Sequence, residues 1–210
     1  RSKIVVGEDM CHDIKLLKEI IVKSMISDGG RGCVNASALI LPCNGYGDEL
    51  ASAVAEEVSK IKAIDPLDSQ AELPAIKSRE MAEKMNGFIE RGLSNNGAED
   101  LTAELRDSER LIRNNGTSFI LPTVIKCSTH QHPLFGLEFL SPFLSIVQVN
   151  DHRELMEAAK NSLSISVITE KDYDLVTALL FDPSIQKVYN GNHFILLRMY
   201  NLELLCQQTG

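Results

Sequence analysis

The sequence has no tryptophan, and aromatic residues make up only 5% of its 210 residues. Proteins that hold single-stranded nucleic acids stack the bases on aromatic side chains, so this scarcity argues against such a role. Basic residues are also outnumbered: 21 Lys and Arg face 29 Asp and Glu, a formal net charge of -8. Because a surface of this sign repels phosphate groups, we expect no general binding to nucleic acids or anionic membranes.

Long hydrophobic runs and paired cysteine motifs are missing as well. No apolar stretch reaches the roughly 18 residues of a membrane span, and the chain begins Arg1-Ser2-Lys3 with neither Met nor a signal peptide. We expect this abrupt start to mark a piece of a longer protein. The five cysteines are odd in number and irregularly spaced, with no CxxC. Free thiols in a reducing compartment fit this pattern, which predicts a cytoplasmic protein.

What is present is the pattern of a globular α/β protein. Hydrophobic residues make up 44% and charged residues 24% of the chain, which is ordinary for a globular protein. The length of 210 residues is enough for one large or two small domains. Predicted strands cover residues 4–6, 36–41, 118–125, 143–149, 165–169 and 186–189, and predicted helices residues 9–28, 48–62, 72–92, 151–162 and 171–181. This alternation predicts a single domain with a largely parallel twisted sheet and flanking helices. Asp9 and Asp151 are the expected N-caps of their helices, and Pro122 should make its strand irregular or an edge.

The segment Gly30-Arg31-Gly32-Cys33 stands between a predicted helix and a predicted buried strand. Glycines allow a tight turn and a close approach of substrate. A cysteine on such a turn can lie exposed at the sheet edge as a nucleophile, with its backbone N–H directed at a developing oxyanion. The alternative is a small, inert, buried side chain, as free cysteines often are.

Two other groups of polar residues are candidates for chemistry. Glu138 lies in the apolar stretch Phe135–Ser145, where a carboxylate needs donors or a ligand; it either caps or pairs locally, or it binds a ligand. Cys127, His130 and His132 have the spacing of three metal ligands. Pro133 follows directly and no fourth ligand is evident, so we predict a loop there and no metal site.

Several segments, taken in order, resemble motifs of the aldehyde dehydrogenase superfamily. Gly30-Arg31-Gly32-Cys33 resembles the family's nucleophile loop Gly-Gln-x-Cys, and Glu138-Phe139-Leu140-Ser141-Pro142 its Glu-Ile-Phe-Gly-Pro motif. Weaker matches are Lys3–Asp9, Asp65–Asp68, Ile120–Val124, Asn161–Thr169 and Val188–Asn190. The resemblance covers about residues 3 to 192. It implies a catalytic domain over 1–192, with a tail of uncertain role at 193–210.

The resemblance implies roles for four residues. Cys33 would be the thiolate that attacks an aldehyde carbonyl, forming a thiohemiacetal and, after hydride transfer to NAD or NADP, a thioester. Glu138 would contact the nicotinamide ribose of the cofactor, and Leu140 would pack against the nicotinamide. Asn190 would support the site by hydrogen bonding. The resemblance also implies a small-molecule aldehyde as substrate and a homodimer as the assembly.

The departures from the family pattern point to a divergent member. Arg31 replaces Gln, Leu140 replaces Phe and Ser141 replaces Gly. A cation at Arg31 would favour the Cys33 thiolate if it faces the thiol, and would have no such effect if it points into solvent. The sequence holds no GxGxxG phosphate loop. The family's general-base Glu, its oxyanion Asn and its dinucleotide fold would lie before Arg1, so we expect no dehydrogenase turnover from this chain alone.

Two alternatives stay open. An acylating aldehyde dehydrogenase, or acyl-CoA reductase, would transfer the acyl group between Cys33 and coenzyme A, with an acyl thioester as product or substrate. Such branches often lack the general-base Glu, because no water needs activation. A non-catalytic scaffold that retained the fold would instead hold Cys33 buried and inert.

Overall fold

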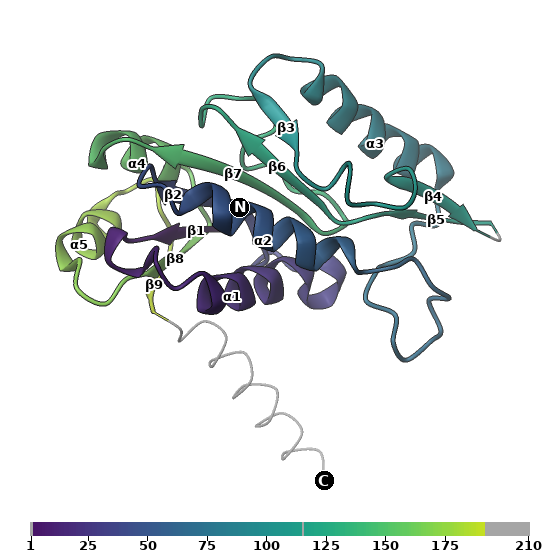
Figure 1. The fold of residues 1–210 in the computed structure, drawn as a ribbon, viewed down its shortest axis with the longest axis horizontal. Helices are drawn as coiled ribbons and strands as arrows, with labels where there is room; N and C mark the ends of the chain where they lie inside the picture. Colours follow the sequence, from purple (N-terminus) through teal and green to yellow (C-terminus); the bar gives the residue numbers. More distant parts are fainter. Residues whose placement is uncertain (1, 115, 192–210) are drawn as a thin grey trace, which may run out of the picture.

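The computed structural model describes residues 2–114 and 116–191, which form a mostly parallel sheet with helices on both faces (Figure 1). The elements are β1 (Ser2–Val6), η1 (Glu8–Met10), α1 (Ile14–Ile26), η2 (Ser27–Gly30), β2 (Ala36–Pro42), α2 (Gly47–Ser59), α3 (Arg79–Leu93), β3 (Ala98–Asp100), β4 (Leu111–Asn114), β5 (Thr117–Ile120), β6 (Thr123–Cys127), β7 (Phe143–Val149), α4 (His152–Ala159), β8 (Ser164–Ile168), α5 (Tyr173–Phe181) and β9 (Val188–Asn190). The tail predicted at 193–210 lies outside the described residues.

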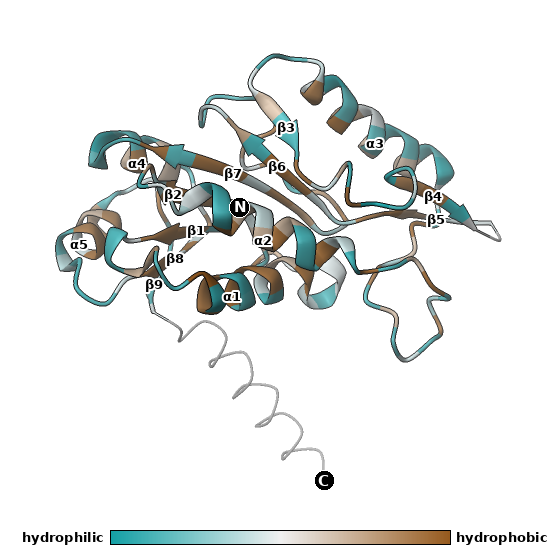
Figure 2. Ribbon diagram, in the orientation of Figure 1, coloured by the Kyte–Doolittle hydropathy of each residue, from teal (hydrophilic) through white to brown (hydrophobic). Residues whose placement is uncertain are grey.

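The central sheet has seven strands in the order β3-β6-β7-β2-β1-β8-β9. All neighbouring pairs are parallel except β3 and β6. The strands in the middle of the sheet are hydrophobic along their length (Figure 2), as expected for strands covered on both faces. The predicted fold class, an α/β fold with a largely parallel sheet and flanking helices, is confirmed.

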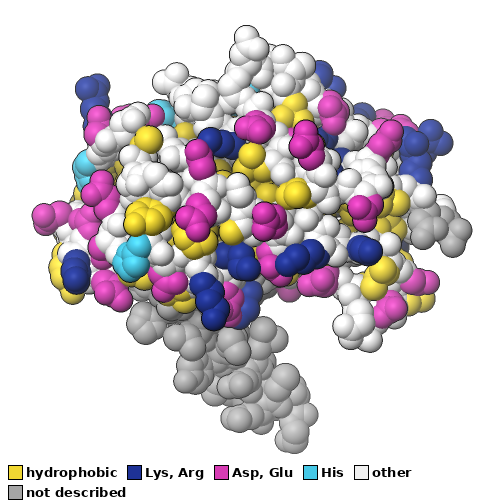
Figure 3. Space-filling model, viewed as in Figure 1, with side chains coloured by type: hydrophobic (Ala, Val, Ile, Leu, Met, Phe, Trp, Pro, Cys, Tyr) yellow, Lys and Arg dark blue, Asp and Glu magenta, His cyan; other side chains and the backbone are white. Residues whose placement is uncertain are grey.

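The two faces of the sheet have separate cores. Alternate residues point to opposite faces, so Ile4 and Val6 of β1 pack under α1 and α2, whereas Val5 packs under α4 and α5. Helix α3 contributes Ile89 to a third cluster with Ile125 of β6 on the α4 side of the sheet. Acidic and basic side chains alternate over the face formed by α1 and α2 (Figure 3), and a Lys18–Glu57 ion pair of 3.2 Å joins the two helices.

The N-cap of the first long helix differs from the prediction. Asp13 caps α1, accepting a hydrogen bond of 3.0 Å from Leu16 N, and the predicted cap Asp9 lies in a short 3-10 turn before it. Asp9 instead accepts hydrogen bonds from Thr169 Oγ1 and from the backbone N–H groups of Glu170 and Lys171, at 2.8 to 2.9 Å. Asp9 therefore joins the ends of β1 and β8. The other predicted cap, Asp151, is confirmed at the start of α4.

The structure differs from the prediction at two elements in the middle of the chain. The helix expected over 72–92 begins only at Arg79, because Ile76 forms a β-bridge with Ser118 and Ser78 caps the helix. The strand expected over 118–125 is two strands that separate at Leu121 and Pro122. Before this break, β5 pairs with β4 in a two-stranded antiparallel sheet; after it, β6 enters the central sheet. Strand β4 was not predicted.

Candidate active site

The Cys33 loop joins the end of α1 to the start of β2, at the amino ends of the central strands. The backbone turns through positive φ angles at Asp28 (51°), Gly29 (64°) and Gly30 (74°), which glycine adopts without strain. From β1, Ser2 Oγ donates a hydrogen bond of 2.9 Å to Cys33 O. From the loop itself, Asn35 Nδ2 donates to Ser27 O at 2.5 Å. These bonds fix the loop on both sides of the cysteine.

The Glu138–Pro142 segment reaches the same edge of the sheet ahead of β7. Gly136 N donates to Ser145 Oγ at 2.8 Å, and Ser145 Oγ donates to Ser37 O at 3.0 Å, which links this segment to the start of β2. Gly30 lies directly against it: a Cβ on Gly30 would be 2.6 Å from Pro142 N. Only glycine at position 30 allows the two segments to approach this closely.

The two segments enclose a pocket of about 330 Å³. Its lining includes Cys33, whose side chain is exposed, together with Arg31, Glu138, Leu140 and Ser141. Leu140 is 48% exposed and Glu138 is exposed as well. We call this the thiol pocket. Three of the four residues to which the sequence assigns site roles, Cys33, Glu138 and Leu140, therefore lie together.

Several hydrogen-bonding groups of the thiol pocket have no partner among the described residues. Ser141 is 2% exposed and Asn35 7% exposed, yet Ser141 Oγ and Asn35 Oδ1 form no hydrogen bond there. The backbone N–H of Cys33 also has no acceptor within residues 2–114 and 116–191. The sequence pointed to Ser141 only as a departure from the family pattern. Asn35 had a usable signal, since it is a polar residue directly before a buried strand.

Asn190 does not join this group. It is the last residue of β9 at the edge of the sheet and is paired with Val167. The thiol pocket instead lies beside the first residues of β2 and β7, several strands away and at the opposite ends of the strands. A direct role for Asn190 at Cys33 has no support in this geometry.

Two of the other cysteines, Cys11 and Cys127, are buried. Burial raises the pKa of Cys127 to about 12 and also raises the pKa of Cys11, so both thiols stay protonated near neutral pH. His132 Nδ1 accepts a hydrogen bond from Leu134 N and lies 3.8 Å from Cys127 Sγ. Within residues 2–114 and 116–191, no group of three or more His, Cys, Asp or Glu side chains is placed to hold a metal ion. Cys43, like Cys33, is exposed.

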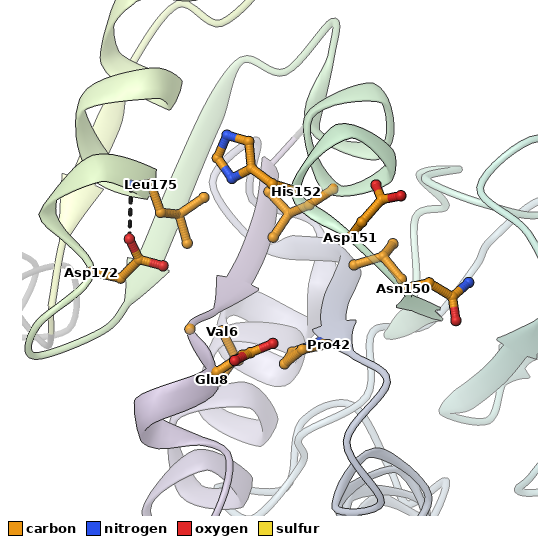
Figure 4. A pocket seen from close by; sticks show the side chains of 11 residues that line it. Val6, Glu8, Pro42, Asn150, Asp151, His152, Asp172 and Leu175 are labelled. Atoms are coloured by element: carbon orange, nitrogen blue, oxygen red, sulfur yellow. Dashed lines mark hydrogen bonds between the residues drawn. The ribbon is translucent and has the colours of Figure 1, made fainter.

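A second, smaller pocket of about 100 Å³ lies at the carboxyl ends of β1, β2 and β7 (Figure 4). Two of its three acidic side chains cap helices: Asp151 accepts a hydrogen bond from Glu154 N, and Asp172 one from Leu175 N, whereas Glu8 is exposed. The positions of these two carboxylates are therefore explained by local helix capping.

Within the part of the chain that the structure describes, no helix has the length and hydrophobicity that a membrane span requires.

Comparison with known proteins agrees with the fold. The chain is 26% identical over 167 residues to a lactaldehyde dehydrogenase from Methanococcus aeolicus, an alignment that covers 78% of this chain and 32% of that protein. An NAD⁺ complex of aldehyde dehydrogenase from Bacillus cereus matches with a TM-score of 0.73 at 17% identity, covering 90% of this chain and 37% of that one. NADP-dependent glyceraldehyde-3-phosphate dehydrogenase from Bacillus halodurans matches with a TM-score of 0.71 at 22% identity and the same coverage.

The chain thus spans about a third of the length of these relatives. The model of the aldehyde dehydrogenase family matches residues 1–178. That match covers most of the sequence and includes both segments that form the thiol pocket. On this ground, the chain belongs to the aldehyde dehydrogenase family.

Proposed function

We propose that this chain is the thiol-bearing catalytic part of an NAD(P)-dependent aldehyde dehydrogenase, with Cys33 as the nucleophile. The observation that carries the proposal is the convergence of two distant sequence segments on one pocket. An exposed cysteine thiol and an exposed glutamate line that pocket together. A scaffold that had lost catalysis would need neither the open thiol nor the tight glycine contact that holds the segments together.

The chemistry proposed for this chain's residues begins at Cys33. As a thiolate, Sγ forms a C–S bond with the carbonyl carbon of the aldehyde, and the carbonyl electron pair moves to oxygen. The N–H of Cys33, which has no acceptor within the described residues, is available to donate to that oxygen. The bond from Ser2 Oγ to Cys33 O holds the following peptide group, Cys33–Val34, and so fixes the loop next to this N–H. The adduct is a thiohemiacetal.

Glu138 and Leu140 are the residues that would hold the cofactor. A carboxylate can accept hydrogen bonds from ribose hydroxyls, and the exposed Leu140 offers an apolar surface beside Cys33. These groups fit the nicotinamide end of NAD or NADP. When bound, that cofactor supplies the hydride acceptor that the oxidation requires. The sequence has no GxGxxG loop to bind its phosphates.

The acyl group of the thioester on Cys33 can be transferred to water or to coenzyme A, which frees the thiol. The lactaldehyde dehydrogenase relative is named for the oxidation of an aldehyde, and for such a reaction we propose water as the acceptor. The altered motif residues Arg31, Leu140 and Ser141 motivate the acylating alternative. The two differ in product: an acid in the first case and an acyl-CoA in the second.

Alkylation by iodoacetamide with peptide mapping tests the nucleophile. Cys33 and Cys43 are both exposed, so exposure alone predicts that they react at equal rates. We expect Cys33 to react several-fold faster than Cys43, because a nucleophile must be populated as its thiolate. Cys11 and Cys127 should stay unmodified until the protein unfolds. Equal rates at Cys33 and Cys43, or no reaction at Cys33, would favour the scaffold and contradict the proposal.

A further inference from the structure

We propose that Arg31 makes the thiol pocket selective for aldehydes that carry an anionic group, a carboxylate or a phosphate. The inference rests on the proposed function, since it assumes that Cys33 is the reacting thiol. It goes further by naming a substrate class and the residue that selects it.

Arg31 lines the thiol pocket with Cys33, and its guanidinium is anchored rather than free in solvent. Nη2 donates a hydrogen bond of 2.8 Å to Ala75 O, in the segment before α3. One neutral carbonyl satisfies only part of a guanidinium, which has five N–H donors in a planar fork suited to carboxylate and phosphate oxygens. Arg31 thus lines the thiol pocket as an exposed cation that is anchored on Ala75, outside the lining, and most of its donors remain available.

Arg31 has no acidic partner among residues 2–114 and 116–191. Other arginines do: Arg79 pairs with Glu83 at 2.8 Å, and Arg106 with Asp100 at 2.7 Å. The carboxylates near the thiol pocket, Glu138 and Asp28, each have an interaction partner of their own. Within the described residues neither carboxylate forms an ion pair with Arg31, so the guanidinium of Arg31 stays open to an anionic ligand.

A second observation points to the same class of ligand. Ser141 is one of the residues that line the thiol pocket, and its hydroxyl is almost completely buried and has no hydrogen-bond partner among the described residues. A buried hydroxyl without a hydrogen-bond partner is energetically unfavourable, and a ligand oxygen can relieve this by accepting a hydrogen bond from it. A cation and an unused hydroxyl donor in one pocket together suit an anionic oxygen.

The charge of the alkylating reagent gives a direct test that needs no cofactor. Iodoacetate carries a carboxylate and iodoacetamide does not, while both form the same kind of C–S bond with release of iodide. We compare the ratio of the two alkylation rates at Cys33 in the native chain and in Arg31→Gln. Removing one unit charge from the lining of a solvent-exposed pocket predicts a decrease of about 3- to 10-fold in the ratio of the iodoacetate rate to the iodoacetamide rate. High salt should reduce the ratio of the native chain in the same direction.

Three controls separate this effect from general changes. Arg31→Lys keeps the charge and should retain most of the ratio. Arg153→Gln removes an exposed charge at the start of α4, outside the thiol pocket, and should leave the ratio unchanged. The ratio at the exposed Cys43 serves as an internal standard within each variant.

Competing anions identify the ligand class. Succinate, a dicarboxylate, and inorganic phosphate are tested separately for slowing iodoacetamide alkylation of Cys33; protection seen in the native chain but lost in Arg31→Gln assigns the carboxylate or the phosphate. The proposal is overturned if Arg31→Gln leaves the ratio unchanged, or if neither anion protects, while Cys33 still reacts fast. A Cys33 that reacts with neither reagent would overturn the proposed function as well.

Discussion

Two buried serines of the site region make opposite predictions at the scale of single residues. Ser145 Oγ is fully used, since it accepts from Gly136 N and donates to Ser37 O. Ser141 Oγ has no partner among the described residues. We expect Ser145→Ala to lower the free energy of unfolding by about 1–3 kcal/mol and Ser141→Ala to leave it equal or raise it. Urea denaturation of both variants measures the difference, and equal losses would show that Ser141 has a structural partner.

Asp9 gives a pH-dependent prediction. Burial raises its pKa, but hydrogen bonds from Thr169, Glu170 and Lys171 outweigh this effect and hold it below the ordinary value of 3.8. A lowered pKa in the folded state means that the carboxylate stabilises the fold above that value, and that this contribution is lost as the pH falls. Asp9→Ala should therefore cost about 1–3 kcal/mol at pH 7, and this cost should shrink as the pH falls below 3.8 and through the lowered folded-state pKa.

Glu8→Ala is the matched control for Asp9→Ala, since Glu8 is the neighbouring acidic residue and its side chain is exposed. Denaturation curves at several pH values provide the measurement. A difference between Asp9→Ala and the native chain that does not change with pH would disprove the role assigned to the carboxylate.

Asp9 also shows that local sequence preference alone cannot identify the cap of a helix. Asp9 and Asp13 are both plausible caps for the helical pattern that follows, and local preference does not separate them. What decides is Thr169, which is far away in sequence and adjacent in space because β1 and β8 pair in parallel. Cys33, Glu138 and Leu140 were brought together by motif resemblance, which carries such long-range information. Asn35 had no motif to identify it.

At the scale of elements, the connection between β3 and β4 depends on one buried carboxylate. Asp100 Oδ2 accepts hydrogen bonds from Arg106 at 2.7 Å and from Arg110 at 2.6 Å, and the three side chains are 5–6% exposed. Burial raises the pKa of Asp100, but the bonds from Thr102 and the two arginines outweigh this and lower it. The charge is therefore retained and fully paired.

We expect Asp100→Asn to lower the free energy of unfolding by about 3–5 kcal/mol, because the buried guanidinium of Arg106 would lose its counter-charge and that of Arg110 would keep only Glu90. Asp107→Asn removes an exposed charge from the same connection and should change the free energy by less than about 0.5 kcal/mol. Thermal and urea denaturation test the pair. Similar effects of both substitutions would mean that the network contributes little.

The two elements that were predicted wrongly have different physical causes. Residues 72–78 have helical periodicity, but Ile76 gains two backbone hydrogen bonds with Ser118, and this pairing excludes the helix. Pro122 has no N–H to donate to a ladder, so the chain leaves the small sheet there and enters the large one. Buried central strands such as β1, β2 and β7 depend mainly on their own apolar residues, and their sequences predicted them well.

At the scale of the whole molecule, the chain spans about a third of the length of its relatives and has no phosphate-binding glycine loop. We therefore expect no turnover when the isolated chain is mixed with NAD or NADP and aldehydes, as followed by absorbance. Cys33 should nevertheless still react with alkylating reagents, because the pocket that exposes it lies within residues 2–191. Clear production of NADH or NADPH would show that the cofactor site is complete within this chain.

The contact of Gly30 with Pro142 has a consequence for how this protein can diverge. A methyl group at position 30 would collide with main-chain atoms, which no change of side chain at position 141 or 142 can withdraw. A substitution at position 30 can therefore be accepted only together with a shift of the facing main chain. In any set of homologous sequences, a residue larger than glycine at this site should appear only where the facing segment has changed its length.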